Sequence, residues 1–262
     1  MESESARGGW ALVTGATGGI GEQFCRQLAR RGHALVLHGR DERRLEALAR
    51  SLADEGAEVR VVLADLSRAG GASELVAKVD ALGVEPTLLV NNAGLGYTSP
   101  FVGVPLERQR ALVQLDVVSV MELAHVYAGR MAAAGGGAIV NVASVAGVMP
   151  GPGMATYFAS KAFVLSLSQA LHEELAQAGV RVLAVCPGPV DTGFWDVAGT
   201  DLSAKRAFML SPEEVARIAL VALGHGRAVC APGLVSKACY AFGRSCPAAL
   251  SRKVARLFNR RK

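Results

Sequence analysis

The feature that most constrains the fold is a short apolar segment that leads through a glycine-rich turn into a helix. Residues 10–13 form an apolar run typical of a buried strand, and residues 22–29 repeat apolar side chains at helical spacing. Between them lie Gly15, Gly19 and Gly21. A strand, a glycine turn and a helix in this order predict a loop that binds the pyrophosphate of a dinucleotide.

Each glycine of this turn has a physical role. Gly15 allows the tight turn, and Gly19 and Gly21 let the backbone approach an anion and let the helix pack on the sheet. The helix N-terminus then faces the anion. The spacing is G-x-x-x-G-x-G, not the commoner G-x-G-x-x-G, and a flexible surface turn is the alternative interpretation.

The alternation of strand and helix continues along the chain. The apolar runs predict seven strands, at residues 11–14, 34–38, 59–64, 88–91, 138–142, 181–186 and 228–231. This pattern predicts an α/β fold, a single Rossmann-type doubly wound domain with a mainly parallel seven-stranded sheet flanked by helices. We expect this domain to cover residues 10–233, between a polar extension at 1–9 and a basic segment at 234–262.

Tyr157 and Lys161 are the second informative feature. Four residues apart on a helix, they lie on one face, and a nearby ammonium favours the phenolate and lowers the pKa of a tyrosine. Such a pair can act as a general acid and base, although the same spacing occurs by chance on many helices. Ser144 follows one predicted strand and Asn91 ends another. Parallel strands present their C-terminal ends to the ligand crevice, so these residues should meet there.

Together these motifs resemble the classical short-chain dehydrogenase/reductase family. The resemblance extends from Trp10 to about Gly233 and rests on Thr14-Gly15-x-x-x-Gly19-Ile20-Gly21, Asn91-Asn92-Ala93-Gly94, Ser144, Tyr157-x-x-x-Lys161 and Pro187-Gly188-Pro189-Val190-Asp191-Thr192. It implies that Tyr157 is the proton donor and acceptor and that Ser144 hydrogen-bonds the substrate oxygen. Lys161 would hold the nicotinamide ribose and depress the pKa of the tyrosine, and Thr192 would bond the carboxamide.

The resemblance also implies a set of cofactor-binding residues. They are Gly15, Thr17, Gly19, Ile20, Gly21, Arg40, Asp65, Leu66, Asn92, Ala93, Gly94, Tyr157, Lys161, Pro187, Gly188, Val190 and Thr192.

One position departs from the family pattern. The helix after Pro105 normally carries an asparagine that completes a catalytic tetrad, and here Asp116 aligns with it. The family role depends partly on backbone geometry, so we expect Asp116 to be the fourth catalytic residue. An ionised carboxylate near Lys161 would change the local electrostatics and, with it, the rate or the pH profile.

Arg40 indicates the choice of cofactor. Residues 35–40 contain no acidic side chain where an NAD enzyme binds the ribose, and Arg40 stands at about that position. A guanidinium there can pair with a 2′-phosphate, which favours NADP(H) over NAD(H). Asp41 is the argument against this choice. Arg43 and Arg44 add positive potential, although each fits a solvated helix face.

The segment after Thr192 predicts a substrate lid at about residues 193–210. It carries apolar side chains, namely Phe194, Trp195, Val197, Phe208, Met209 and Leu210. A helix should then begin at Ser211, with Pro212 at its first position. Four residues before Tyr157 are expected to line the other side of the pocket, namely Met149, Pro150, Pro152 and Met154. Such a pocket suits a hydrophobic ketone or alcohol, unless these residues only pack the lid onto the body.

The C-terminal segment is basic. No acidic residue occurs between Glu214 and Lys262, whereas arginines and lysines alternate there with apolar residues. A basic amphipathic helix on an anionic membrane surface is one interpretation, and a solvated helix docked on the body is the one we favour. We expect no nucleic-acid partner, since no recognition motif accompanies the charge.

The remaining composition restricts the class of protein. The 262 residues can build one large core, and no apolar run reaches the roughly 18 to 20 residues of a membrane span. The polar start is unlike a signal peptide, and the five cysteines lack metal or redox spacing, so no metal site is expected. We expect a cytoplasmic protein. The family resemblance implies a homodimer or homotetramer formed through the helices at 106–134 and 155–178.

The sequence therefore predicts an NADP-dependent oxidoreductase that interconverts a secondary alcohol and a ketone or aldehyde by hydride transfer. A carbonyl reductase for a hydrophobic substrate is the preferred hypothesis. A 3-oxoacyl or lipid ketone reductase at a membrane surface is one alternative. A non-catalytic NADPH-binding sensor or scaffold is the other, and only Asp116 supports it.

Overall fold

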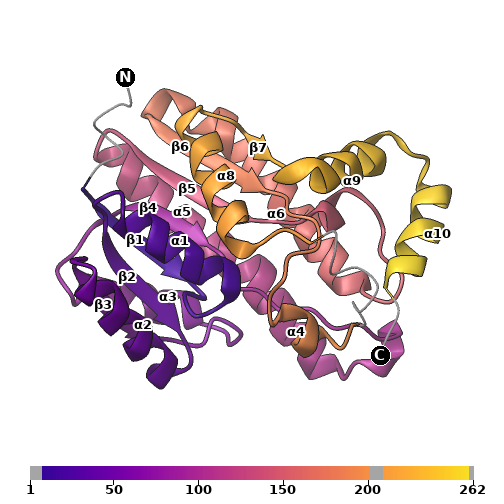
Figure 1. Ribbon diagram of the computed structural model, residues 1–262, viewed down its shortest axis with the longest axis horizontal. Coiled ribbons are helices and arrows are strands. Elements are labelled where there is room, and N and C mark those ends of the chain that lie inside the picture. Colours follow the sequence, from indigo (N-terminus) through magenta and orange to yellow (C-terminus); the bar gives the residue numbers. More distant parts are fainter. Residues whose placement is uncertain (1–7, 201–208, 260–262) are drawn as a thin grey trace.

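Seven strands pair into one parallel sheet in the computed structural model, which describes residues 8–200 and 209–259 (Figure 1). The strand order is β3-β2-β1-β4-β5-β6-β7, and every pairing is parallel. The strands are β1 (Trp10–Thr14), β2 (Ala34–Gly39), β3 (Val59–Leu63), β4 (Pro86–Asn91), β5 (Gly137–Val142), β6 (Val180–Val185) and β7 (Val229–Cys230). The predicted fold class is confirmed.

Helices cover both faces of this sheet (Figure 1). They are α1 (Gly19–Ala29), α2 (Glu42–Asp54), α3 (Gly71–Asp80), α4 (Leu106–Val113), α5 (Ser119–Ala133), α6 (Ala155–Glu174), α7 (Phe194–Ala198), α8 (Pro212–Gly224), α9 (Gly233–Ser245) and α10 (Ala248–Phe258). Short 3₁₀ turns lie at η2 (Phe101–Gly103), η4 (Val145–Val148) and η5 (Ala176–Ala178), and η3 (Gln114–Val118) is a π turn between α4 and α5.

Alternate residues of the central strands face separate cores. In β1, Ala11 and Val13 belong to the core beneath α1, α2 and α8, whereas Leu12 belongs to the core beneath α3 and α5. Successive side chains of a strand point to opposite faces, so a strand covered on both sides must be apolar throughout. This explains why the strands could be located as continuous apolar runs.

The start of α8 follows the prediction. Ser211 has extended backbone angles, its hydroxyl accepts a hydrogen bond from the Glu214 amide (3.1 Å), and Pro212 occupies the first helical turn. A side-chain acceptor and a proline at these positions fix where a helix begins. The preceding lid is described only up to residue 200 and from residue 209, so much of its predicted span lies outside the described residues.

The helix predicted at 106–134 is present, and it is more apolar than the sequence analysis expected. α4, η3 and α5 run continuously over Leu106–Ala133, and these 28 residues are long and apolar enough to cross a membrane. Half of the apolar window is buried inside the protein, where α5 packs against β4 and β5. The buried half of its apolar side chains contributes to the core, and the helix carries the π turn that contains Asp116.

Candidate active site

The glycine loop joins the end of β1 to the start of α1. Gly15 has φ of +63°, a left-handed conformation that glycine adopts without strain. The Asn92 side chain donates to the carbonyls of Thr14 and Gly15, both at 3.0 Å. No side chain caps α1 at Gly18, which leaves the first amides of this helix available to an anion.

Thr14 ties this loop to the neighbouring strand. Its hydroxyl accepts from the amides of Asn92 (3.0 Å) and Ala93 (3.1 Å) and donates to the carbonyl of Val90 (3.3 Å). These bonds span β1 and β4, the point where the strand order changes direction and where open α/β sheets bind ligands. Sequence reasoning assigned Thr14 no role, although a buried threonine ending an apolar strand is a signal that could have been used.

Arg40 and Arg44 flank the outer end of this crevice. Arg40 is 60% exposed, and its Nη1 lies 3.9 Å from Asp65 Oδ1. Arg44 Nη2 donates to the Thr17 carbonyl of the glycine loop (2.6 Å), so Arg44 is more than part of a solvated helix face. Asp41 caps α2 by accepting from the Arg44 amide (3.1 Å). The carboxylate that argued for NAD thus has a structural role. Leu66 lies on the same edge and is buried.

Tyr157, Lys161 and Ser144 meet at the C-terminal end of β5. Both α6 residues face the strand: Lys161 Nζ donates to the Val142 carbonyl (3.1 Å) and lies 5.6 Å from the centre of the Tyr157 ring. The Ser144 hydroxyl accepts from the Ala146 amide (3.1 Å) and donates to the Pro187 carbonyl (3.4 Å). The predicted catalytic side chains are therefore brought together.

Asp116 lies behind Lys161 and is fully buried in the π turn. Its Oδ1 accepts from the Leu95 amide (2.8 Å), and its Oδ2 lies 3.4 Å from Lys161 Nζ. The Ser160 hydroxyl contacts the same Oδ2 (3.3 Å). Gly94 adjoins both groups, because a Cβ built there would lie 3.3 Å from Lys161 Nζ. The aspartate therefore forms a buried ion pair with the lysine.

This ion pair changes the expected acidity of the tyrosine. Burial raises the pKa of Tyr157, Lys161 opposes that shift, and the Asp116 carboxylate adds to it. The net pKa of Tyr157 lies above its ordinary value, because burial outweighs the lowering by Lys161 that the sequence led us to expect. Burial lowers the pKa of Lys161, but Asp116 and Tyr157 together raise it by more than burial lowers it. The net pKa is therefore raised, and the ammonium is retained. Burial also raises the pKa of Asp116, against the opposing charge of Lys161.

The motif after β6 connects the catalytic residues with the lid. The Pro187 carbonyl also accepts from the Val145 amide (3.0 Å), and the Gly188 amide donates to the Ser236 hydroxyl of α9 (2.8 Å). Thr192 lies over the glycine loop, since a Cβ at Gly19 would approach Thr192 Cγ2 to 2.7 Å. Both ends of the cofactor site predicted from sequence therefore face one crevice.

The described part of the lid covers the tyrosine. The ring of Phe194 packs on that of Tyr157, with centroids 5.4 Å apart. Trp195 Nε1 donates to the Val190 carbonyl (2.8 Å), and the Ala198 carbonyl accepts from the Thr98 amide (2.7 Å). The first turn of the lid is thus anchored on both sides of the crevice.

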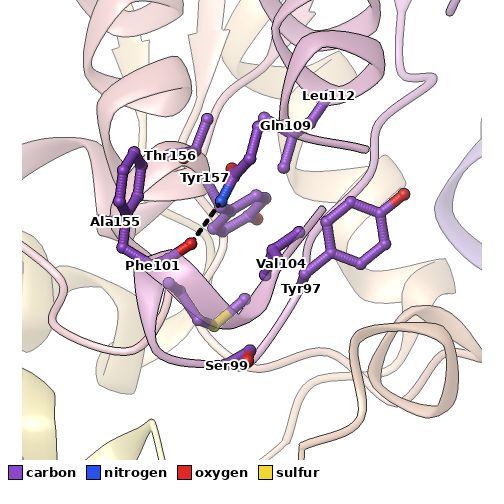
Figure 2. A pocket seen from close by; sticks show the side chains of 10 residues that line it. Tyr97, Ser99, Phe101, Val104, Gln109, Leu112, Ala155, Thr156 and Tyr157 are labelled. Atoms are coloured by element: carbon purple, nitrogen blue, oxygen red, sulfur yellow. Dashed lines mark hydrogen bonds between the residues drawn. The ribbon is translucent and has the colours of Figure 1, made fainter. Parts of the chain in front are cut away.

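A small pocket opens beside Tyr157 (Figure 2). It contains about 220 Å³ of empty space, including its open mouth. Its lining residues are Tyr97, Ser99, Phe101, Val104, Gln109, Leu112, Met154, Ala155, Thr156 and Tyr157. Of the four residues expected here, only Met154 belongs to this lining. The remaining lining comes from α4, from the start of α6 and from the segment between β4 and α4; the sequence analysis missed that segment because irregular loops carry no periodic signal.

Buried amides link the sheet to the catalytic helix. Asn91 Nδ2 donates to Asn141 Oδ1 (2.9 Å), and Asn141 Nδ2 donates to Ser168 Oγ on α6 (2.9 Å). Buried polar groups need such partners, and a connected set specifies one arrangement. This series of hydrogen bonds fixes α6, and with it Tyr157, against β4 and β5.

Comparison with known proteins identifies the family. A family model described as short chain dehydrogenase matches residues 9–202, most of the chain. The chain belongs to the short-chain dehydrogenase family. This dehydrogenase is therefore an oxidoreductase that acts on CH–OH or keto groups with a nicotinamide cofactor.

Three similar proteins illustrate the range of this family. This dehydrogenase is 35% identical over 192 residues to the very-long-chain 3-oxoacyl-CoA reductase of Anas platyrhynchos, covering 71% of this chain but only 61% of that reductase. It thus spans less than two thirds of that relative's length. It is 38% identical to a short-chain dehydrogenase from Sphingobium yanoikuyae in complex with NADPH, with a TM-score of 0.80 and coverage of 86% and 88%.

The third similar protein was solved with the other nicotinamide cofactor. A short-chain dehydrogenase from Burkholderia phymatum in complex with NAD is 29% identical, with a TM-score of 0.79 and coverage of 91% and 93%. Neighbours of this dehydrogenase thus bind either NADPH or NAD. The comparisons support a nicotinamide cofactor for this chain.

Proposed function

We propose that this dehydrogenase is an NADP(H)-dependent reductase that interconverts a hydrophobic ketone or aldehyde and the corresponding alcohol. The observation that carries the proposal is the convergence of Ser144, Tyr157 and Lys161 beneath the ring of Phe194. A proton-transferring group, a polar anchor and an apolar cover are what a nonpolar carbonyl substrate requires.

Each catalytic side chain has a role that its position supports. Tyr157 protonates the substrate oxygen during reduction and accepts that proton during oxidation, because its phenol lines the pocket and lies beside Lys161. Ser144 orients the same oxygen by a hydrogen bond. Lys161, whose ammonium Asp116 retains, holds the ribose hydroxyls. When bound, the nicotinamide supplies or accepts the hydride.

The preference for NADP(H) rests on the cations at the outer end of the crevice. Arg40 is exposed there, and Arg44 is held against the glycine loop by its bond to the Thr17 carbonyl. Two guanidinium groups beside the position of the ribose favour a 2′-phosphate. The commitment of Asp41 to capping α2 removes the competing argument for NAD.

The two alternative functions differ in their support. Reduction of a 3-oxoacyl or other lipid ketone agrees with the apolar lining and with the similarity to a very-long-chain 3-oxoacyl-CoA reductase. The hypothesis of a non-catalytic NADPH sensor rested on Asp116 alone. Since Asp116 holds Lys161 and the Leu95 amide in place, its presence supports an organised catalytic site and not a decayed one.

We further propose a cytoplasmic homodimer or homotetramer with a small-molecule substrate. Exposed apolar side chains on α4, α5 and α6 support this assembly: Val113 is 39%, Met121 43% and Phe163 37% exposed. Apolar groups of this size gathered on exposed helix faces suit a contact between subunits.

The catalytic proposal is tested with Tyr157→Phe. Reduction of a panel of hydrophobic ketones with NADPH should fall by about 10²- to 10⁴-fold, because the variant lacks the general acid. NADPH binding, followed by fluorescence titration, should remain within about twofold, since the ring and its packing are kept. Wild-type protein that binds NADPH but reduces no ketone or aldehyde would instead support the sensor.

The cofactor proposal is tested with Arg40→Ala and Arg44→Ala. Each should weaken NADPH binding by about 10- to 100-fold, the cost of losing a charge-assisted contact, and leave NADH binding unchanged. Arg43→Ala is the matched control, because this arginine precedes Arg44 on the same helix and has no partner among the described residues. Equal affinity of wild-type protein for NADH and NADPH would contradict the preference.

A further inference from the structure

α10 lies outside the sheet and its covering helices, at the right of Figure 1. It docks on the body through small residues: Ser251 and Ala255, one turn apart, are 1% and 4% exposed. Residues four apart share one face of a helix. The opposite side of α10 is therefore left without a protein partner over its described length.

The exposed side of α10 combines leucines and cations. Leu250 and Leu257 are 51% and 60% exposed and are seven residues apart, so they lie on the same side. Arg252, Lys253 and Arg256 are exposed beside them. A solvated helix needs the cations but gains nothing from exposed leucines. An apolar edge next to a basic face is typical of helices that lie in the membrane interface.

The charge of this surface is not neutralised by the protein. No acidic residue occurs between Glu214 and Lys262. Within residues 8–200 and 209–259, none of the three α10 cations has an acidic side chain within ion-pair distance. Unpaired cations on one surface complement an extended anionic surface.

The end of α10 reaches the rim of the pocket. Asn259 Nδ2 donates to the Pro152 carbonyl (3.1 Å), and the next carbonyl, of Gly153, accepts from the Ser99 amide (2.8 Å). Ser99 lines the pocket beside Tyr157 (Figure 2). A single turn thus connects α10 with the pocket mouth.

More apolar surface is exposed at the same rim. Phe101, in η2 and two residues after Ser99, lines the pocket and is 63% exposed, and its neighbour Val102 is 93% exposed. Exposed valine and phenylalanine side chains at a pocket mouth are costly in water and favourable in an apolar boundary.

We propose that the surface formed by α10 and η2 binds an anionic lipid bilayer. The cations would contact the headgroups, and the exposed leucines, Phe101 and Val102 would enter the boundary with the acyl chains. This inference adds a membrane partner to the proposed function. It rests on that function in one respect: it implies that an apolar substrate passes from the bilayer into the pocket.

The test is co-sedimentation of the full chain with phosphatidylcholine vesicles that contain or lack phosphatidylglycerol, at low ionic strength. We expect binding to the anionic vesicles alone. Binding should fall about tenfold or more in the charge variant Arg252→Gln/Lys253→Gln/Arg256→Gln. Vesicle binding of the apolar variant Leu250→Ser/Leu257→Ser should fall by a similar factor, although its charge is unchanged.

The matched control is Arg30→Gln/Arg50→Gln/Arg60→Gln. It removes the same charge from exposed positions in or beside α1, α2 and β3, at the other end of the sheet (Figure 1), and should bind like wild type. Absence of wild-type binding, or an equal loss in the control, would overturn the proposal. Binding of the protein to RNA but not to vesicles would also overturn it. So would a lower oligomeric mass of the leucine variant in a protein that does not bind vesicles, because the leucines would then form a subunit contact. Sedimentation requires no turnover, so this result is independent of whether the protein reduces ketones.

Discussion

At the scale of single residues, Asp116 most distinguishes this active site from its family pattern. An asparagine could accept the Leu95 hydrogen bond but could not pair with Lys161 as an anion. The aspartate therefore adds negative charge to the network and raises the pKa of both Tyr157 and Lys161. This direction of the pKa shifts agrees with the expectation from sequence that a carboxylate here changes the electrostatics around Lys161.

Asp116→Asn should shift the pH profile of turnover to lower pH. Removal of the carboxylate lowers the pKa of Tyr157, so the phenolate needed for alcohol oxidation forms at lower pH, and the phenol needed for reduction is lost at lower pH. The measurement is kcat/KM against pH in both directions.

Asp54→Asn is the control for this change. It removes one negative charge from an exposed position at the end of α2 and should leave the profile in place. Superimposable profiles for wild type and Asp116→Asn would show that Asp116 does not influence the acidity of Tyr157.

At the scale of elements, the site depends on close contact between η4 and α6. Ser144 caps η4, Tyr157 and Lys161 lie on α6, and Gly147 of η4 faces the backbone of α6. A Cβ at Gly147 would lie 2.6 Å from the Lys161 carbonyl oxygen, closer than real contacts allow. Gly147 is also tied to the serine, because its amide donates to the Ser144 carbonyl (2.9 Å), so close packing at this glycine helps to hold Ser144 near α6.

Gly147→Ala should destabilise the protein by about 1–3 kcal/mol, the usual cost of overpacking, and should lower kcat by separating Ser144 from Tyr157. Thermal unfolding and ketone reduction measure the two effects. Gly129→Ala, in α5, is the control, because no heavy atom lies within 4 Å of its added Cβ. It should stabilise the helix by up to about 1 kcal/mol. Equal melting temperatures for the two variants would refute this account.

The elements differ in how well the sequence predicted them. The central strands were found because they are buried on both faces, as Leu12 and Val13 illustrate. The start of α8 was found because Ser211 and Pro212 act locally. The π turn at Asp116 and the pocket wall at Phe101 were not found. Their conformations depend on contacts with distant segments, which leave no period in the sequence.

At the scale of the whole molecule, the order of the strands brings the residues of the candidate active site together. Thr14, Asn91 and Ser144 follow or end strands that are neighbours in the sheet but far apart in the chain. The sequence predicted their meeting because parallel strands align their C-terminal ends. The division into domain and flanking segments, and the roles of the individual site residues, stay predictions.

The proposed assembly gives a prediction at this scale. Met121→Glu/Phe163→Glu places two charges on the exposed apolar faces of α5 and α6 and should reduce the oligomer to a monomer, because burying unpaired charges is unfavourable. Light scattering after gel filtration measures the mass. Val221→Glu, at a 46% exposed position on α8, should leave the mass unchanged. A monomeric wild-type protein would contradict the proposed oligomer.

The contact between Phe194 and Tyr157 has a consequence for which molecules the protein accepts. A ligand that packs on the face of the Tyr157 ring must take the place of the Phe194 ring already packed there. A short ketone offers too little surface to replace that contact, whereas a flat, ring-shaped or long-chain molecule restores it in full. Substrate selection then depends less on shape complementarity than on displacement of the Phe194 side chain, which sets a minimum apolar surface for a substrate that binds.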